Sequence, residues 1–172
     1  EVSTTKEKLN EAEIKIIEEL ELKENSLMWH CRNYFLFSFY LAGIRAGDLI
    51  QLRWCNITSE GRLEYRMAKT KKDRSIFLHD KARDILEHYY NDSCKPTHYI
   101  FPLLDSTADY AKAITPEQKA TLPPAMIIKL NDIVGAKNSL LNKYLNKIAA
   151  EAKIEKHISM HIARHSFAKI AK

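Results

Sequence analysis

The chain has 172 residues, of which 45% are hydrophobic and 28% charged, a composition typical of a globular domain. This length predicts a single domain over residues 1–172. The most apolar run, residues 34–42, is too short to span a bilayer, so no membrane partner is expected. The net charge of +5 weakly favours polyanionic partners, and three widely spaced cysteines without a CxxC pair predict reduced thiols.

The first elements in chain order are predicted to be helices. Asn10 and Glu13 form a capping-box pattern at the start of an amphipathic helix. Residues 25–42 predict a second helix that is apolar nearly all round and is therefore expected to be buried. Residues 46–53 predict a short third helix after a glycine.

The pattern then becomes strand-like. Residues 63–67 and 75–78 flank the polar stretch KTKKDR and predict a β-hairpin. Asp80 is expected to cap a helix that reaches about Tyr90. The segment 98–102 (HYIFP) fits either a third strand or a buried extended piece.

The second half of the chain is predicted to be mostly helical. Residues 105–124 are polar and contain prolines, which indicates a loop with at most a short helix. Residues 125–152 predict long helical stretches that Gly135 could break in two, and Ser159 is the expected N-cap of a last helix. The predicted fold class is mainly α with a small antiparallel β-sheet, that is, α+β.

The late segment HIARH carries three candidate functional side chains. On a helix His161, Arg164 and His165 lie three and four positions apart, so they share one face. A solvated polar face is one interpretation, and a zinc site on the two histidines is another. However, the segment lacks the acidic residue of a zinc hydrolase motif, and an adjacent guanidinium would repel a cation. Phosphate binding fits better, because a guanidinium fork matches phosphate oxygens.

Two further polar features precede this helix. In AGIRAGDLIQLRW, Arg45 lies at a junction of two helices, and Asp48 could hold Arg45 or cap the second helix. An ordinary loop ion pair is the alternative. In the hairpin MAKTKKDRSIFL, four of six consecutive residues are basic. This stretch fits a solvated turn or a tip that carries lysines to DNA phosphates.

In their order and spacing, these three segments resemble the catalytic domain of the tyrosine recombinase (phage integrase) family, over about residues 9–172. AGIRAGDLIQLRW and HIARHSFA are the most specific parts of the match. The long helical segment before HIARH is similar to that of integrases from Bacteroides-type mobile elements. The resemblance implies the recombinase catalytic-domain fold without its C-terminal helices.

The resemblance also implies roles for the residues that match. Arg45 and Arg164 correspond to the two catalytic arginines that stabilise the scissile phosphate. Asp48 corresponds to the acid that buttresses the first arginine. His161 corresponds to the catalytic histidine of the His-x-x-Arg box, and His165 to a supporting histidine.

The hairpin supplies the remaining candidates. Lys69 corresponds to the lysine that protonates the leaving oxygen, with Lys71 and Lys72 as alternatives in this register. Lys71, Lys72 and Arg74 are also expected to contact DNA. The implied reaction is transesterification through a 3′-phosphotyrosine, which needs no metal and no other cofactor.

The nucleophile is the main departure from the family pattern. The family carries its tyrosine after the His-x-x-Arg box, but all eight tyrosines of this chain precede HIARH, and the last is Tyr144. We expect the chain to stop before the nucleophile and the fragment alone to be inactive in DNA cleavage.

The resemblance implies double-stranded DNA as a partner, and other recombinase protomers that form a tetramer in the parent protein. The fragment itself could be monomeric. A bacterial cytoplasmic protein associated with the nucleoid is expected. Two alternatives stay open, a non-catalytic DNA-binding module and a metal-dependent hydrolase. The sequence beyond Lys172 would test the first, and metal analysis of a His161→Ala variant the second.

Overall fold

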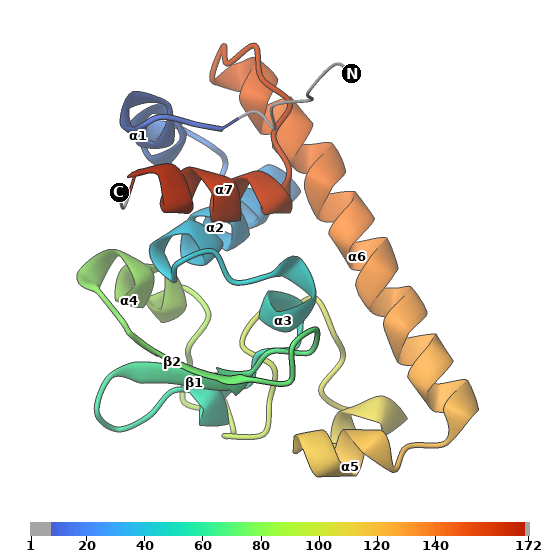
Figure 1. Ribbon diagram of the computed structural model, residues 1–172. Helices are drawn as coiled ribbons and strands as arrows, with labels where there is room; N and C mark the ends of the chain where they lie inside the picture. The colour runs from blue at the N-terminus through green and yellow to red at the C-terminus, as the bar shows by residue number, and fades with distance from the viewer. Residues whose placement is uncertain (1–7, 171–172) are drawn as a thin grey trace. The chain divides into compact units, whose positions relative to one another are not determined.

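The computed structural model describes residues 8–170, and these form helices and one β-hairpin (Figure 1). The predicted class, mainly α with a small antiparallel β-sheet, is confirmed over these residues. The chain divides into two compact units: a first unit of residues 1–46 and 139–172, and a second unit of residues 47–138. The single domain expected over residues 1–172 stays a prediction.

The described part of the first unit consists of helices whose starts follow local capping signals. Asn10 and Glu13 close the predicted capping box, and the Ser26 side chain accepts a hydrogen bond from the Trp29 amide at 3.2 Å. The helices of this unit are α1 (Glu11–Glu19), α2 (Leu27–Tyr40), the last part of α6 (Pro124–Glu151) and α7 (Met160–Ile170).

Helix α2 forms the core of the first unit, as its apolar sequence predicts. Eight of its fourteen residues are buried, which is too many for a helix with one solvent-facing side. Figure 1 shows α7 lying across α2, and Phe167 of α7 packs edge-on against Phe39 of α2 with ring centroids 6.1 Å apart. This packing fixes the position of α7, which carries the HIARH segment, against α2.

The second unit contains the sheet and most of the short helices. Strands β1 and β2 are antiparallel, with Arg62 opposite Phe77 at one end and Arg66 opposite Asp73 at the other. The elements are α3 (Ala46–Ile50, whose first residue belongs to the first unit), the 3₁₀ turn η1 (Trp54–Asn56), β1 (Arg62–Arg66), β2 (Asp73–Phe77), α4 (Asp80–Glu87), the 3₁₀ turn η2 (Asp109–Lys112), α5 (Pro116–Ala120) and the first part of α6.

Helix α6 corrects one expectation, because Gly135 does not break it. The helix runs without interruption for 28 residues. A Cβ at Gly135 would meet no atom within 4 Å, so this glycine faces open space. An exposed glycine costs a helix only about 1 kcal/mol relative to alanine, and the flanking residues outweigh that. Despite this length, the described chain has no helix with the apolar character that crossing a membrane requires.

Two smaller expectations change around the hairpin. The segment 98–102 is not a third strand, since Tyr99 makes only an isolated bridge to Arg53 and bends flank it. Its middle residues, Tyr99, Ile100 and Phe101, are buried as expected. Asp80 begins α4 but does not cap it: the N-cap position belongs to His79, and the helix already ends at Glu87.

Candidate active-site residues

Arg164 is fixed by the turn that follows α2. The Gly43 amide donates a hydrogen bond to the Ser38 carbonyl at 2.8 Å, and the Ser38 hydroxyl donates to the Ile44 carbonyl at 2.7 Å. Ala42 and Gly43 have φ angles of 56° and 75°, so the chain reverses sharply there. The Arg164 guanidinium then donates to the Gly43 carbonyl at 3.3 Å.

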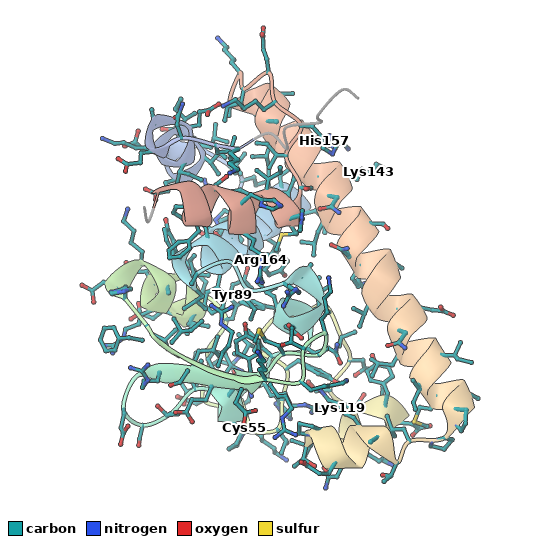
Figure 2. The ribbon with its side chains drawn as sticks, in the orientation of Figure 1. Cys55, Tyr89, Lys119, Lys143, His157 and Arg164 are labelled. Carbon is teal, nitrogen blue, oxygen red and sulfur yellow. The ribbon has the colours of Figure 1, made fainter. Side chains whose placement is uncertain are left out.

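The close approach of this turn to α7 requires a glycine. A Cβ at Gly43 would lie 2.6 Å from the Cα of Arg164 and 2.8 Å from its Cβ, well inside van der Waals contact. Arg45 follows two residues later, so its Cα lies within about 7 Å of that of Gly43. The first unit therefore brings the backbone of Arg45 close to that of Arg164. Figure 2 shows Arg164 on α7.

His161 and His165 lie one helical turn apart on α7 and contact each other. Their Nε2 atoms are 2.8 Å apart, and the rings meet edge to face with centroids 4.3 Å apart. Such a contact needs one ring to donate a proton and the other to accept it. His161 is exposed and His165 is half-buried. The pair thus holds a transferable proton at the surface of the helix.

Two hydrogen bonds fix α7 in the first unit. The Met160 amide at its start donates to Asn142 Oδ1 of α6 at 2.9 Å. Further along, the fully buried Ser166 hydroxyl accepts a hydrogen bond from the Leu9 amide at 2.9 Å. These contacts hold both sides of the segment that carries Arg164, so its position does not depend on the local helix alone.

In the second unit, Asp48 is bound to the hairpin. Its buried carboxylate accepts a hydrogen bond from the Ala68 amide at 3.1 Å, directly beside Lys69. The Met67 amide donates to the Lys72 carbonyl, and the Lys71 amide donates back to the Met67 carbonyl, each at 2.9 Å. The Lys69 side chain is exposed on this closed turn. The predicted support of Arg45 by Asp48 stays a prediction.

The other predicted DNA-contacting residues differ in their surroundings. Lys71 and Lys72 are exposed. Arg74 is half-buried: its guanidinium donates to the Tyr65 hydroxyl at 3.1 Å and lies 5.9 Å from the centre of that ring. Arg74 therefore stabilises the hairpin, and its role in DNA contact stays a prediction.

The structure also reveals two basic residues that the sequence analysis missed. Arg53, which sits in the LRW run of AGIRAGDLIQLRW, is only 3% exposed. Lys119 lies on α5, and burial lowers the pKa of its amine. Neither the LRW run nor the sequence around Lys119 carries a pattern that distinguishes these residues from solvated basic side chains, because neighbouring residues point to different faces of a helix or strand.

The residues described so far divide between the two units. Arg45, His161, Arg164 and His165 belong to the first unit, and Asp48, Lys69, Lys71, Lys72 and Arg74 belong to the second. Arginines beside a histidine pair suit stabilisation of a phosphate and movement of a proton. Among residues 8–170, no three His, Cys, Asp or Glu side chains gather closely enough to hold a metal ion.

Comparisons with known proteins agree on the class of protein. The model of the phage integrase family matches residues 8–170. The crystal structure of XerA recombinase is similar in fold, with a TM-score of 0.52 and 17% sequence identity over 94% of this chain. This chain spans about half the length of that structure, 48%. No curated protein sequence gives a significant match.

Proposed function

The chain belongs to the phage integrase family, as its sequence motifs predict, and we propose that it carries the phosphate-binding part of a site-specific DNA recombinase. The proposed reaction is transesterification through a 3′-phosphotyrosine, as in an integrase of a mobile element. The observation that carries the proposal is the packing of Arg164 against Gly43, which brings the Arg45 backbone beside it.

Arg45 and Arg164 stabilise the scissile phosphate in this proposal. Attack on a phosphodiester builds negative charge on its non-bridging oxygens, and two guanidinium groups neutralise that charge without a metal. Their backbones are held by a turn that leaves no space for a side chain at Gly43. Such rigidity favours catalysis, because the donors need no reorganisation when charge develops.

Lys69 is the proposed general acid. An alkoxide is a poor leaving group unless it receives a proton, and an exposed amine on a hairpin turn can deliver one. The bond from the Ala68 amide to Asp48 fixes the backbone immediately before Lys69, which supports this choice over Lys71 and Lys72. Those two lysines and Arg74 are proposed to contact the DNA backbone.

The two histidines are proposed to act on the proton of the attacking phenol. His161, the more exposed of the two, is proposed to accept that proton or to hydrogen-bond the phosphate. His165 is a supporting residue that acts through its contact with the His161 ring.

We infer that the nucleophilic tyrosine comes from outside residues 1–172. The last tyrosine, Tyr144, lies on α6 before the His-x-x-Arg box, and a lysine ammonium lies 4.6 Å from the centre of its ring. The 172-residue chain alone is therefore expected to bind a phosphate but not to cleave DNA. The proposed partners are double-stranded DNA and further recombinase protomers, which form a tetramer on DNA.

A suicide DNA substrate tests the proposal in a chain extended to include the tyrosine. Such a substrate traps the covalent protein–DNA complex, because the short fragment that carries the leaving 5′-hydroxyl dissociates and religation becomes impossible. Arg45→Ala and Arg164→Ala should each slow formation of the complex by roughly 10²- to 10³-fold, with smaller effects on DNA binding. Lys129→Ala, an exposed lysine of α6, serves as the control and should leave the rate unchanged.

Complex formation at the normal rate by either arginine variant would refute the assignment. DNA binding without any covalent complex in the extended wild-type chain would instead favour a non-catalytic DNA-binding module. Stoichiometric zinc that is lost in His161→Ala would favour the metal-dependent hydrolase.

A further inference from the structure

The second unit contains a cleft whose lining includes none of the four proposed catalytic residues, although it includes Asp48 and Lys71. It has a volume of about 440 Å³, within the range of small-molecule sites. Its walls come from residues 48–56, from the hairpin residues 65–71, and from residues 114–131, which include α5. All of these residues lie within the second unit, so the cleft is complete there.

Arg53 is a buried cation in the wall of this cleft. Its guanidinium donates to the carbonyls of Thr97 at 2.6 Å and Ala113 at 3.2 Å, and to the Tyr99 hydroxyl at 3.0 Å. It also lies 4.2 Å from the centre of the Tyr99 ring. These partners are all neutral, and the buried Nε atom has no hydrogen-bond partner in the described structure. A buried guanidinium whose hydrogen-bond partners are all neutral keeps its positive charge and so favours an anion in the adjoining cleft.

Lys119 supplies a second cation to the same cleft. Burial is the main cause that lowers the pKa of its amine, and the nearby Arg53 charge lowers the pKa further, while Asp48 opposes both. Within residues 8–170 the Lys119 ammonium makes no hydrogen bond and no ion pair. Its charge is therefore incompletely compensated, and it has donors available for a ligand.

The acids near the cleft do not cancel this charge. Arg66, also in the lining, is paired with Asp73 at 3.0 Å and with Glu117 at 3.4 Å, so it is already neutralised. The only acidic residue of the lining is Asp48, and its carboxylate already accepts the Ala68 amide. Arg53 and Lys119, with the exposed Lys71 at the rim, thus leave the cleft with an excess of positive charge.

Much of the remaining lining is apolar, which indicates that the expected ligand has an apolar part as well as a negative charge. A bare phosphate would leave this surface in contact with water, whereas an organic anion would cover it. The larger apolar side chains of the lining include Met67, Ile114, Leu122, Ile127 and Leu130.

We propose that this cleft binds a small organic anion, with one carboxylate, sulfonate or phosphate group between Arg53 and Lys119 and an apolar body against the side chains of α5 and α6. Because the hairpin residues 65–71 form one wall, an occupant would also restrain the segment that carries Lys69. The site does not depend on the proposed recombination chemistry.

The test measures binding of two probes to the 172-residue chain, phenyl phosphate and 8-anilinonaphthalene-1-sulfonate. Titration followed by two-dimensional NMR of backbone amides should give saturable 1:1 binding, with shifts at residues 65–71 and 114–131. Lys119→Met should lower the binding affinity for both probes by at least about tenfold, which is the loss expected for one charge-assisted hydrogen bond. Lys129→Met is the matched control and should bind like wild type, because Lys129 lies on α6 beside the wall residues but is not itself part of the lining.

Inorganic phosphate and phenol separate the two parts of the site, and each alone should bind more weakly than phenyl phosphate. Four results would overturn the proposal: no saturable binding, shifts outside the cleft, equal affinity of Lys119→Met and wild type, or inorganic phosphate binding as tightly as phenyl phosphate. Competition by short duplex DNA at equal phosphate concentration would also overturn it, since the site would then serve the DNA backbone. The folded state of Lys119→Met is checked by its amide spectrum.

Discussion

Gly43→Ala should displace Arg164 and destabilise the first unit. The added methyl carbon would lie 2.6 Å from the Arg164 Cα and 2.8 Å from its Cβ and Cγ. The Cα belongs to the helix backbone and the Cβ is bonded directly to it, so rotation of the side chain moves neither of them away. The substitution also places a side chain at a φ of 75°, a conformation that alanine adopts only with strain.

The magnitude follows from these two contributions. A left-handed φ costs a non-glycine residue about 1–2 kcal/mol. Forcing an extra methyl group into a packed contact costs about 1–3 kcal/mol. Their sum, about 2–5 kcal/mol, is a large part of the roughly 5–15 kcal/mol by which native domains are stable.

Urea unfolding followed by tryptophan fluorescence measures this effect. Trp29 lies in the first unit and Trp54 in the second, so a Trp54→Phe background leaves one buried reporter for the unit that contains Gly43. With a urea m-value of about 1–3 kcal/mol per molar, the midpoint should fall by about 1 M or more.

Gly135→Ala is the matched control, because the same substitution there meets open space on an exposed helix. It should stabilise the chain by about 0.5–1 kcal/mol through its helix propensity. If Gly43→Ala left the midpoint within the error of wild type, the close approach of the 42–45 turn to α7 would be wrong. The argument for placing Arg45 near Arg164 would then fail with it.

Two further predictions concern buried groups. Burial raises the pKa of the Cys31 thiol to about 12, so at pH 8 only about 10⁻⁴ of it is thiolate. In a Cys94→Ser background, Cys31 should react with a chromogenic disulfide reagent only after unfolding, whereas the exposed Cys55 should react in the native state. A fast phase that survives the further substitution Cys55→Ser would contradict this. Ser166→Ala should destabilise the first unit by about 1–3 kcal/mol in urea unfolding, because the buried Leu9 amide loses its acceptor; the exposed Ser59→Ala is its control, and equal stability of the two variants would disprove the contact.

The sequence predicted those parts of the fold that local signals control. The capping box of Asn10 and Glu13 needs only four consecutive residues, and it forms as predicted. The hairpin follows from two strand-like runs separated by a polar stretch, and the bounds of both strands agree within two residues. The motifs around Arg45 and Arg164 likewise identified the family, because their order along the chain is visible without coordinates.

The parts that the sequence could not predict depend on tertiary contacts. A glycine in AGIRAG indicates a turn, but only the structure shows that it faces the Arg164 backbone. Gly135 is also a glycine, but it faces open space and lies within the unbroken helix α6. The sequence also carried no reason to join Lys119 with Arg53, because both strands and several short helices lie between them in the chain, and their packing brings the two residues to one cleft.

The contact between the two histidines decides which of the two proposed roles His161 can take. An Nε2–Nε2 distance of 2.8 Å allows a single proton between the rings. If His165 donates that proton, the His161 Nε2 is occupied as an acceptor, and a phenol could transfer its proton to His161 only after the pair separates. If His161 donates, its Nδ1 is left to accept a proton, and its Nε2 cannot at the same time donate to a phosphate. In the proposed reaction His165 therefore selects the tautomer in which His161 acts, although it touches neither the phosphate nor the phenol. A helix that spaces two histidines by four residues provides this control through its geometry alone.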